Sequence, residues 1–436
     1  MEAQEKKHAQ LGWIMYDWAN SAFVTTITAA VLPVYYASVA AVNLPEHIRT
    51  AYWAYTSTIA LLLVALMGPV MGAMADFRGA KKKYLSVFAL VGIAGAALLY
   101  FVREGDWLMA SLFYIIGNVG FAGANVFYDS LLPHVASPEE TDQVSSKGYA
   151  FGYLGGGLLL AINLGMIMFA PDGETTALMS RLSFLTVAGW WLIFTIPLWR
   201  FVKEPTRRIL RGEEGFNPVQ AAFSRLAHTF GEIRKYKQLF KFIIAFWLYN
   251  NGIGTIIVMA TIYGTELNFS QLTTIGTLLM VQFVGIPFSL LFGWLGKKIG
   301  TKKSILISLG VYTAVAIGGY FMFQEIHFWL LGFGVAMVQG GSQALSRSLF
   351  SRMLPKSKSA EFYSFFSVSE KVAGTAGPLM FGVVSTIMGG SRLSIVSLII
   401  FFIIGGYLLT RVDEDEGMRV ALAEEARLVE ASSEDI

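Results

Sequence analysis

The chain has 436 residues, of which 55% are hydrophobic and 14% are charged, and its formal net charge is +3. Soluble domains carry about 25% charged residues, so this composition is typical of a protein embedded in lipid. The small net charge argues against a nucleic-acid partner. Because cysteine is absent, disulfides, thiolate metal sites and cysteine nucleophiles are excluded. The sequence has no phosphate-binding glycine loop and no paired metal-ligand spacing, so we expect neither a cofactor nor a metal.

Apolar stretches of about 20 residues, the length that crosses a bilayer, alternate along the chain with short charged clusters. We therefore predict an all-α membrane protein with twelve transmembrane helices. The expected helices span residues 12–39, 51–75, 83–102, 107–133, 146–170, 178–202, 239–264, 272–296, 303–323, 328–354, 360–388 and 392–411. Asp17 and Asn20 interrupt the first apolar stretch, so we interpret it as an uncleaved span rather than a signal peptide.

The longest connection, at 203–238, divides the chain into two halves of six helices, 1–202 and 239–411, and an acidic tail follows at 412–436. Alternate connections differ in their basic residues. The connections at 41–50, 103–106, 171–177, 265–271, 324–327 and 389–391 contain no lysine. Lysines lie in the alternate connections, as Lys81, Lys82, Lys83, Lys203, Lys235, Lys237, Lys297, Lys298, Lys302, Lys303, Lys356 and Lys358. By the positive-inside rule, both termini and the lysine-rich connections are cytoplasmic. We expect a multi-pass protein of a bacterial inner membrane, with the lipid bilayer as its surroundings and a monomer as its working form.

Within the long connection, apolar residues recur at helical spacing opposite Arg225 and His228. They are Val219, Ala222, Phe223, Leu226 and Phe230. The pattern predicts an amphipathic helix, which lies either on the inner membrane surface or in solvent as a plain linker. The acidic tail predicts a soluble end with no function of its own.

The two halves are related by an internal repeat. GAMADFRGAKK at 72–82 aligns with GWLGKKIGTKK at 293–303, and the pairs Leu132-Pro133 and Leu354-Pro355 follow in nearly the same register. Two homologous halves with a site between them are the plan of a transporter that alternates access by rocking one half on the other.

The segment at 72–82 resembles the loop between helices 2 and 3 of the major facilitator superfamily, with Asp76 as its acid and Arg78, Lys81 and Lys82 as its basic residues. Four further motifs are more specific. They are YDWANSAF at 16–23, YDSLLP at 128–133, SSKGYAFGY at 145–153 and QALSRS at 343–348. With these motifs the chain resembles the vacuole-effluxer family over nearly its whole length. The resemblance implies the major facilitator fold and, from the fungal members, the export of neutral amino acids.

Ionisable residues inside the predicted spans need a partner or a purpose, because each costs at least about 2.5 kcal/mol at the bilayer centre. Apart from Lys147, which is expected to reach the membrane surface, the candidates are Asp17, Asp129, Arg347, Glu370 and Lys371. We assign them to proton coupling and gating. Asp129 and Arg347 are predicted to form the charge pair of an inner gate. Asp17 has no basic residue on its own helix face, so we expect it to carry the proton.

Polar residues also form stripes on the helices that line the central cavity in the resembling superfamily. The candidates for substrate binding are Tyr16, Asn20, Asn118, Asn125, Tyr149, Tyr153, Tyr249, Asn250, Asn251, Gln339 and Gln343. The alternative role for these side chains is to hydrogen-bond neighbouring helices.

The repeat exchanges Asp76 for Lys297, and we predict two cytoplasmic latches from this exchange. Asp76, followed by Arg78, is expected to face the basic loop and the N-terminus of helix 11, since the helix dipole favours an anion there. Lys297 is expected to face the acidic loop before helix 5. Both latches should be modest in strength, since such pairs are partly solvated.

We interpret the chain as a secondary active transporter of a small neutral or zwitterionic metabolite, amino-acid-like from the resemblance, with protons as a candidate coupling ion. The alternative is a membrane enzyme or flippase acting on a lipid-linked substrate. The histidines lie in loops, near helix ends or at a terminus and form no metal-ligand pattern, which argues against the enzyme. A third interpretation, a receptor with this fold, is disfavoured because the tail and the central connection are too short for an effector domain.

Overall fold

The computed structural model describes residues 2–206, 217–231, 233–373, 376–388 and 391–433, and the regular secondary structure of these residues is helical. The N-terminal half contains α1 (Glu2–Ala22), the π-helical segment η1 (Phe23–Val31), α2 (Leu32–Tyr35), η2 (Tyr36–Ala40), α3 (Glu46–Arg78), α4 (Lys81–Leu98), η3 (Leu99–Phe101), α5 (Trp107–Ser130), α6 (Leu132–Val135), α7 (Thr141–Met168) and α8 (Gly173–Phe201). The C-terminal half contains α10 (Lys237–Glu266), α11 (Gln271–Ile299), α12 (Thr301–Tyr320), α13 (Glu325–Arg352), η5 (Lys356–Lys358), α14 (Ser359–Ala373), α15 (Ala376–Met388), α16 (Ser391–Ser397) and α17 (Ile399–Thr410). Between the halves lie α9 (Pro218–Gly231) and η4 (Ile233–Tyr236), and α18 (Glu414–Ser433) follows them.

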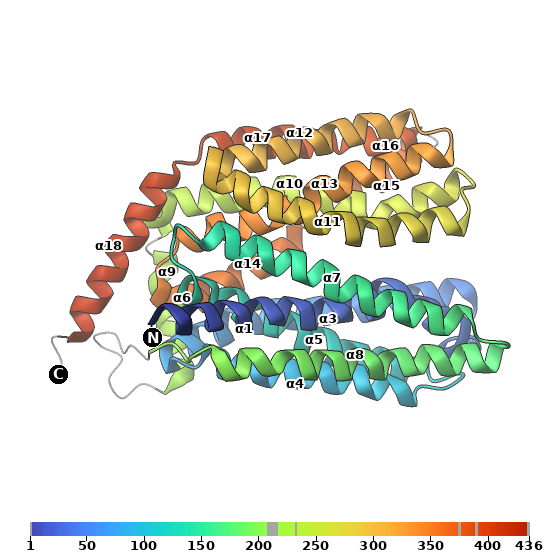
Figure 1. Ribbon diagram of the computed structural model, residues 1–436, viewed down its shortest axis with the longest axis horizontal. Coiled ribbons are helices and arrows are strands. Elements are labelled where there is room, and N and C mark those ends of the chain that lie inside the picture. The colour runs from blue at the N-terminus through green and yellow to red at the C-terminus, as the bar shows by residue number, and fades with distance from the viewer. Residues whose placement is uncertain (1, 207–216, 232, 374–375, 389–390, 434–436) are drawn as a thin grey trace.

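The helices form two bundles that lie side by side, one for each half of the chain (Figure 1). Each bundle has its own large cluster of buried apolar side chains, and the two clusters divide nearly at the sequence boundary between the halves. The predicted all-α fold class is confirmed, and the two bundles are consistent with the expected division into two halves. The bundles meet mainly through α7 against α11 and α13, and through α14 against α3 and α5.

In the described part of the chain, ten helices are long and apolar enough to cross a bilayer. The other two predicted spans correspond to α13 and to α14 together with α15. α13 has the length of a span but is polar toward its C-terminal end, where it carries Gln343, Ser346, Arg347 and Ser348. A helix with this pattern crosses the membrane inside a bundle, because its polar face must be covered by protein.

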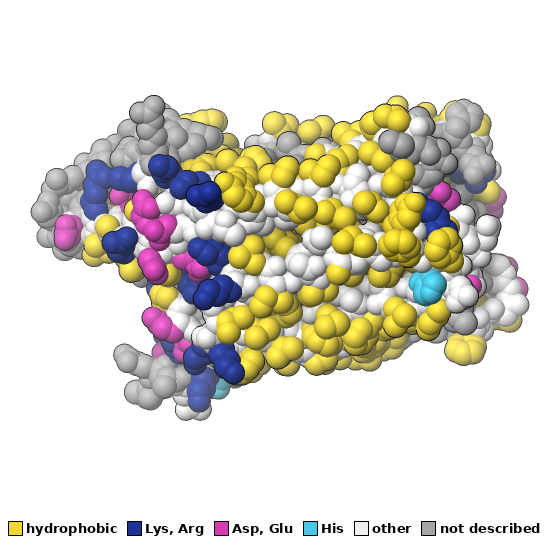
Figure 2. Space-filling model, turned by 90° about the horizontal axis from the view of Figure 1, so that it is seen from above, with side chains coloured by type: hydrophobic (Ala, Val, Ile, Leu, Met, Phe, Trp, Pro, Cys, Tyr) yellow, Lys and Arg dark blue, Asp and Glu magenta, His cyan; other side chains and the backbone are white. Residues whose placement is uncertain are grey.

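Basic residues gather at one end of the molecule, and the side chains between the two ends are largely apolar (Figure 2). The N- and C-termini lie at this same end (Figure 1). We call it the basic end. It holds the turn between α3 and α4, η5 and the connecting helix α9.

The amphipathic connection folds as α9, and its apolar stripe is divided between two surroundings. Ala222 and Leu226 pack on Ala73 of α3, whereas Val219 and Phe223 are exposed. Arg225 was expected on a polar face but is buried, with its guanidinium carbon 5.4 Å from the centre of the Phe77 ring. The expectation that Arg225 faces solvent was wrong because its guanidinium packs on an aromatic ring of another helix. Helical periodicity does not reveal such a neighbour. The side chains of His228 and Phe230 lie outside the described residues.

The acidic tail forms α18, which packs against the basic end rather than extending into solvent. Glu424 is buried and lies 3.0 Å from Lys235 and 3.5 Å from Lys358. Glu425 accepts hydrogen bonds from the backbone and hydroxyl of Ser357. A soluble end was expected, but the tail's acids face the lysines of two loops that lie far away in the sequence.

Candidate functional site

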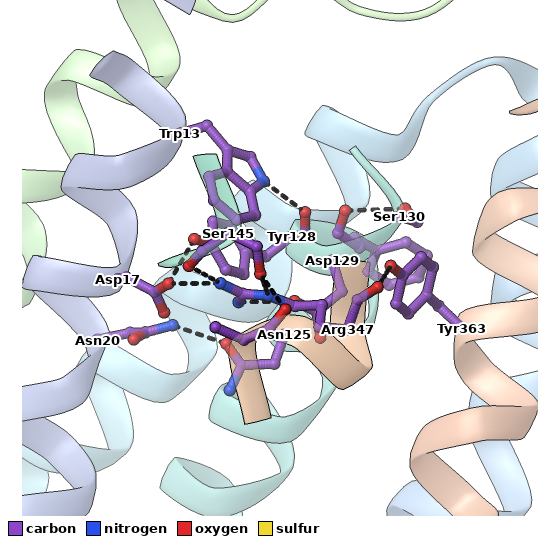
Figure 3. Close-up of polar contacts among 12 residues, drawn as sticks. Trp13, Asp17, Asn20, Asn125, Tyr128, Asp129, Ser130, Ser145, Arg347 and Tyr363 are labelled. Carbon is purple, nitrogen blue, oxygen red and sulfur yellow. Dashed lines mark hydrogen bonds and ion pairs between the residues drawn. The ribbon is translucent and has the colours of Figure 1, made fainter. Parts of the chain in front are cut away.

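Arg347 of α13 lies where the two halves touch near the basic end, and it is the centre of a buried charge cluster (Figure 3). Its Nη1 lies 3.1 Å from the Asp129 carboxylate of α5, and its Nη2 lies 3.2 Å from the Asp17 carboxylate of α1. Nε donates to the Ser145 hydroxyl at 2.9 Å. One guanidinium from the C-terminal half therefore binds three side chains of the N-terminal half, a geometry that suits its planar fork of donors.

Aromatic rings surround the guanidinium and exclude water from it. The Arg347 guanidinium carbon lies 4.8 Å, 5.5 Å and 4.5 Å from the ring centres of Trp13, Tyr128 and Tyr149. The Tyr128 hydroxyl donates to Asp17 at 2.7 Å, and Tyr363 donates to the Arg347 carbonyl at 3.2 Å. These rings strengthen the ion pairs because they lower the local dielectric constant and attract the cation.

The close approach of α7 depends on Gly148. A Cβ at this position would lie 2.5 Å from Asp17 Oδ2 and 3.0 Å from Arg347 Nη2. Only glycine leaves room for the two charged groups to meet beside the helix. The same helix supplies the Ser145 carbonyl, which accepts from Arg347 Nη2 at 3.0 Å.

Asp17 was predicted to be an acid without a basic partner, and this premise was wrong. Its side chain is 14% exposed and pairs with Arg347. The partner lies on another helix, 330 positions away in the chain, where the pattern of α1 does not reveal it. Asp129 is the more accessible carboxylate of the cluster, with its side chain 25% exposed.

A second contact between the halves is built around Asp76, at the C-terminal end of α3. One of its oxygens lies 2.9 Å from the ammonium of Lys81, and the other accepts the backbone N–H of Glu361 at 2.8 Å. Lys81 continues the contact by donating to the Lys356 carbonyl at 2.9 Å. Asp76 thus meets the N-terminus of α14, but its pair with Lys81 is buried, so the expectation of a partly solvated latch was wrong. Arg78 is exposed and takes no part in this contact.

The acidic loop before α7 is held by a different cation from the one predicted. Asp142 lies 3.5 Å from Arg352, and it accepts hydrogen bonds from Thr301 at 2.7 Å and from Ser348. Lys297 is exposed. The prediction was wrong because Gly296, and not Lys297, is the residue of α11 that faces Asp142. A Cβ on Gly296 would lie 2.8 Å from Asp142 Oδ2. Lys297 is the next residue of the helix, so its side chain points about 100° away from Asp142.

Four of the polar side chains predicted to bind substrate form hydrogen bonds between helices, namely Asn20, Asn125, Tyr249 and Asn251. Asn20 donates to Asn125 at 2.6 Å, and the hydroxyls of Tyr249 and Ser346 are 2.6 Å apart. The Asn251 side chain accepts the backbone N–H of Gly377 at 3.2 Å. Such bonds match the alternative role considered for these residues.

The remaining candidates occupy several environments. Tyr16 is completely buried, with its ring 5.1 Å from that of Tyr128, and Asn118 donates to Tyr114 at 3.1 Å within its own helix. Asn250 and Gln343 are half-buried. The predictions for Glu370 and Lys371 concern side chains outside the described residues.

A cavity of about 270 Å³ lies away from the basic end, between η1 of the N-terminal half and the outer parts of α10, α11, α12 and α13. Its lining is largely apolar, with polar groups supplied by Thr25, Thr277, Gln282 and Gln339, and none of its lining residues is charged. Gln339 was predicted to bind substrate. Tyr153 packs near this residue, since a Cβ on Gly340 would lie 2.5 Å from its ring.

Reasoning from the sequence missed several residues of the site. Ser145, Tyr128 and Trp13 surround Arg347, and Lys81 rather than a loop lysine pairs with Asp76. Ser145 and Tyr128 belong to the motifs that carry the family resemblance. Their place in these motifs was the sequence feature that could have indicated a role at the site. The roles of neutral side chains could not be predicted from the sequence, because they depend on which helix packs against the one that carries them.

Comparison with known proteins agrees with this architecture. Residues 45–422 match the family described as "Vacuole effluxer Atg22 like". The chain is 37% identical to the "Uncharacterized MFS-type transporter YxiO" of Bacillus subtilis, over 94% of this chain and 96% of that protein. It is 24% identical to autophagy-related protein 22 of Coccidioides immitis, over 86% of this chain and 74% of that protein.

Solved structures of transporters share the fold. The proton:xylose symporter XylE superposes with a TM-score of 0.72 at 15% identity, covering 95% of this chain and 96% of that one. FucP in its outward conformation gives a TM-score of 0.69 at 13% identity, covering 93% and 98%. These relatives are transporters and not enzymes, which removes the membrane enzyme as an interpretation. Its fold, its paired halves and its relatives together show that the chain belongs to the Atg22-like vacuole-effluxer family and is a multi-pass transporter of the major facilitator superfamily.

Proposed function

We propose that this protein moves a small neutral or zwitterionic, amino-acid-like metabolite by alternating access with proton coupling, and that Arg347, Asp17 and Asp129 form its inner gate. The observation that carries the proposal is one cation of the C-terminal half held between two carboxylates of the N-terminal half. The basic end is proposed to be the cytoplasmic end, in accordance with the positive-inside rule.

The cluster has the properties that a gate requires. Opening the basic end would separate α13 from α1 and α5, and it would break both ion pairs of Arg347 together with its bonds to Ser145. The Asp76 and Asp142 contacts between the halves lie at the same end and would open in the same movement. The cavity lies on the opposite side of the cluster, so the described conformation corresponds to a closed cytoplasmic side.

The charge count of the cluster supports the proposed proton coupling. One guanidinium faces two carboxylates, so the cluster has a net negative charge when both acids are ionised. Protonation of one acid would leave a neutral cluster with only one ion pair to break, so opening of the basic end would become easier. Asp17 and Asp129 therefore share this role in our proposal, in place of Asp17 alone.

The cavity supports a substrate without net charge. A substrate with a net charge would be desolvated against a lining that has no charged side chain to balance it, which is costly. The volume of about 270 Å³ is close to the lower limit for ligand pockets, about 300 Å³. A small molecule with an apolar body and a few hydrogen-bonding groups suits both properties.

The test is uptake of labelled neutral amino acids and related metabolites into proteoliposomes, with and without an imposed pH gradient. We expect the wild type to accumulate a substrate only with the gradient. Asp17→Asn and Asp129→Asn should each abolish accumulation against a concentration gradient yet retain exchange of labelled for unlabelled substrate. Gradient-driven uptake that is unchanged in both variants would contradict the proposed coupling.

A further inference from the structure

A groove runs between α3 and α4 at the basic end. The two helices are joined by a short turn at Gly79, which has a φ of 60°, and they diverge from it. Both pack on α5, but they touch each other at few positions. The space between them near the turn, which Pro218 of α9 also lines, has a volume of about 580 Å³.

Two cations lie at the wide end of this groove. Arg78 in the last turn of α3 and Lys83 in the first turn of α4 both line it and are exposed. Neither side chain forms an ion pair with a residue in the described part of the chain. Glu204 accepts instead from the backbone N–H groups of Lys82 and Lys83, at 2.7 Å and 3.0 Å.

The neighbouring basic residues are already engaged. Lys82 donates to the carbonyls of Trp199 and Val202, both at 2.7 Å, and Lys81 is buried against Asp76. Arg78 and Lys83 are therefore the cations of this turn that remain available to an anion from outside the chain.

The walls of the groove are apolar and continue along the membrane-facing surface. Met71 of α3 and Phe88 of α4 line the cation-bearing space, and both also line a narrow apolar pocket that reaches α5. Val87 of α4, which also lines this space, is exposed by 53%. Farther from the basic end, Met67 of α3 and Leu90 of α4 are exposed by 41% and 48%. A ligand in the groove would meet two positive charges at one end and hydrocarbon along its length.

From this arrangement we propose that the groove binds an anionic phospholipid of the leaflet at the basic end. The phosphate lies between Arg78 and Lys83, and an acyl chain follows Met71, Phe88 and the exposed apolar residues of α3 and α4. A basic pocket between transmembrane helices at this level of the bilayer is a recognised setting for anionic headgroups. A soluble phosphate compound would use the cations but would leave the apolar walls unfilled.

The test is native mass spectrometry of the full-length protein in detergent, titrated with phosphatidylglycerol or with phosphatidylcholine. The double variant Arg78→Gln/Lys83→Gln should bind phosphatidylglycerol about thirtyfold more weakly, because each cation near the membrane surface contributes about 1 kcal/mol, while its weak binding of phosphatidylcholine stays unchanged. The matched control is Lys297→Gln/Lys303→Gln. It removes two exposed charges from the corresponding loop of the other half and should retain wild-type affinity.

Two further measurements locate the lipid and identify its source. A phosphatidylglycerol with a photoreactive acyl chain should cross-link to residues between 63 and 91. Inorganic phosphate, added in excess, should not displace the lipid. Equal loss of affinity in both double variants, cross-linking mainly to α12, or full displacement by inorganic phosphate would each overturn the proposal.

Discussion

At the scale of single residues, the behaviour of the site depends on the geometry of one guanidinium. Arg347 uses three nitrogen atoms to bind Asp17, Asp129 and Ser145 at once. A buried ion pair is costly to form, because both charges lose water, and it is retained where each charge has several partners. The cluster satisfies this condition with donors and acceptors from α1, α5 and α7.

Replacing Arg347 with lysine should reduce transport about tenfold or more. Lysine keeps the charge but has a single nitrogen, so at least one hydrogen bond to a charged group is lost, with a contribution of about 1.5–3 kcal/mol. Initial uptake rates in proteoliposomes measure the effect. Arg411→Lys, at an exposed arginine, is the control and should transport normally. Equal rates for Arg347→Lys and the wild type would show that the fork geometry is unimportant.

Gly148→Ala should destabilise the protein, because its methyl group would overlap Asp17 and Arg347. Overpacking of this kind typically costs about 1–3 kcal/mol. Gly165 lies on the same helix, and a Cβ there meets nothing within 4 Å, so Gly165→Ala should be neutral or slightly stabilising through helix propensity. Thermal unfolding in detergent compares the two variants. The steric explanation fails if both melt at the same temperature.

At the scale of helices, the ends of α3 and α14 form a buried contact between the halves. Asp76 is bound by Lys81 and by the first turn of α14, and the side chains of Asp76 and Lys81 are 0% and 3% exposed. An anion at a helix N-terminus is favourable because the free N–H groups and the helix dipole are both positive there. Opening this end must expose both charges to water.

Asp76→Lys should slow transport while substrate binding stays nearly intact, since Asp76 lies outside the cavity. The reversed charge would face Lys81 and the positive end of α14, so this variant also risks misfolding. Asp76→Asn keeps the shape and removes only the charge. Binding measured by thermal shift with substrate, beside uptake rates, separates the two effects. Asp415→Asn, at an exposed acid, is the control, and a matching loss of binding in Asp76→Asn would refute the role of a latch.

At the scale of the whole molecule, the polar contacts between the halves lie at the basic end and the cavity lies toward the other end. This asymmetry is what alternating access requires, because a transporter must close one side before it opens the other. The docked helix α18 adds to the closed end, since its acids bind lysines of η4 and η5.

The orientation in the membrane can be tested with single cysteines, because the chain has none of its own. Cysteine at Gly173, an exposed position at the end opposite the lysines, should react with a membrane-impermeant reagent in intact cells. Cysteine at the exposed Lys298 should react only after the membrane is permeabilised. Labelling of position 298 from outside would reverse the proposed orientation.

Much of the fold could be predicted from the sequence, because a bilayer imposes local rules. A span must be apolar over its length and the lysines must gather on one side, so the division into two halves and the position of the basic end followed directly. The exceptions have a common cause. α13 and the tail helix α18 are polar, and the sequence does not reveal what covers a polar face.

The site was predictable only in part. The cost of a buried charge identified Asp17, Asp129 and Arg347 as residues that need partners. This conclusion requires only that each residue lies within a transmembrane span. Which charge meets which was decided by the tertiary structure. Arg347 reaches Asp17 across 330 positions of sequence, and Arg352 rather than Lys297 meets Asp142. Such pairs depend on how each helix is rotated about its axis and shifted along its neighbours in the packed bundle, and no local sequence pattern specifies this.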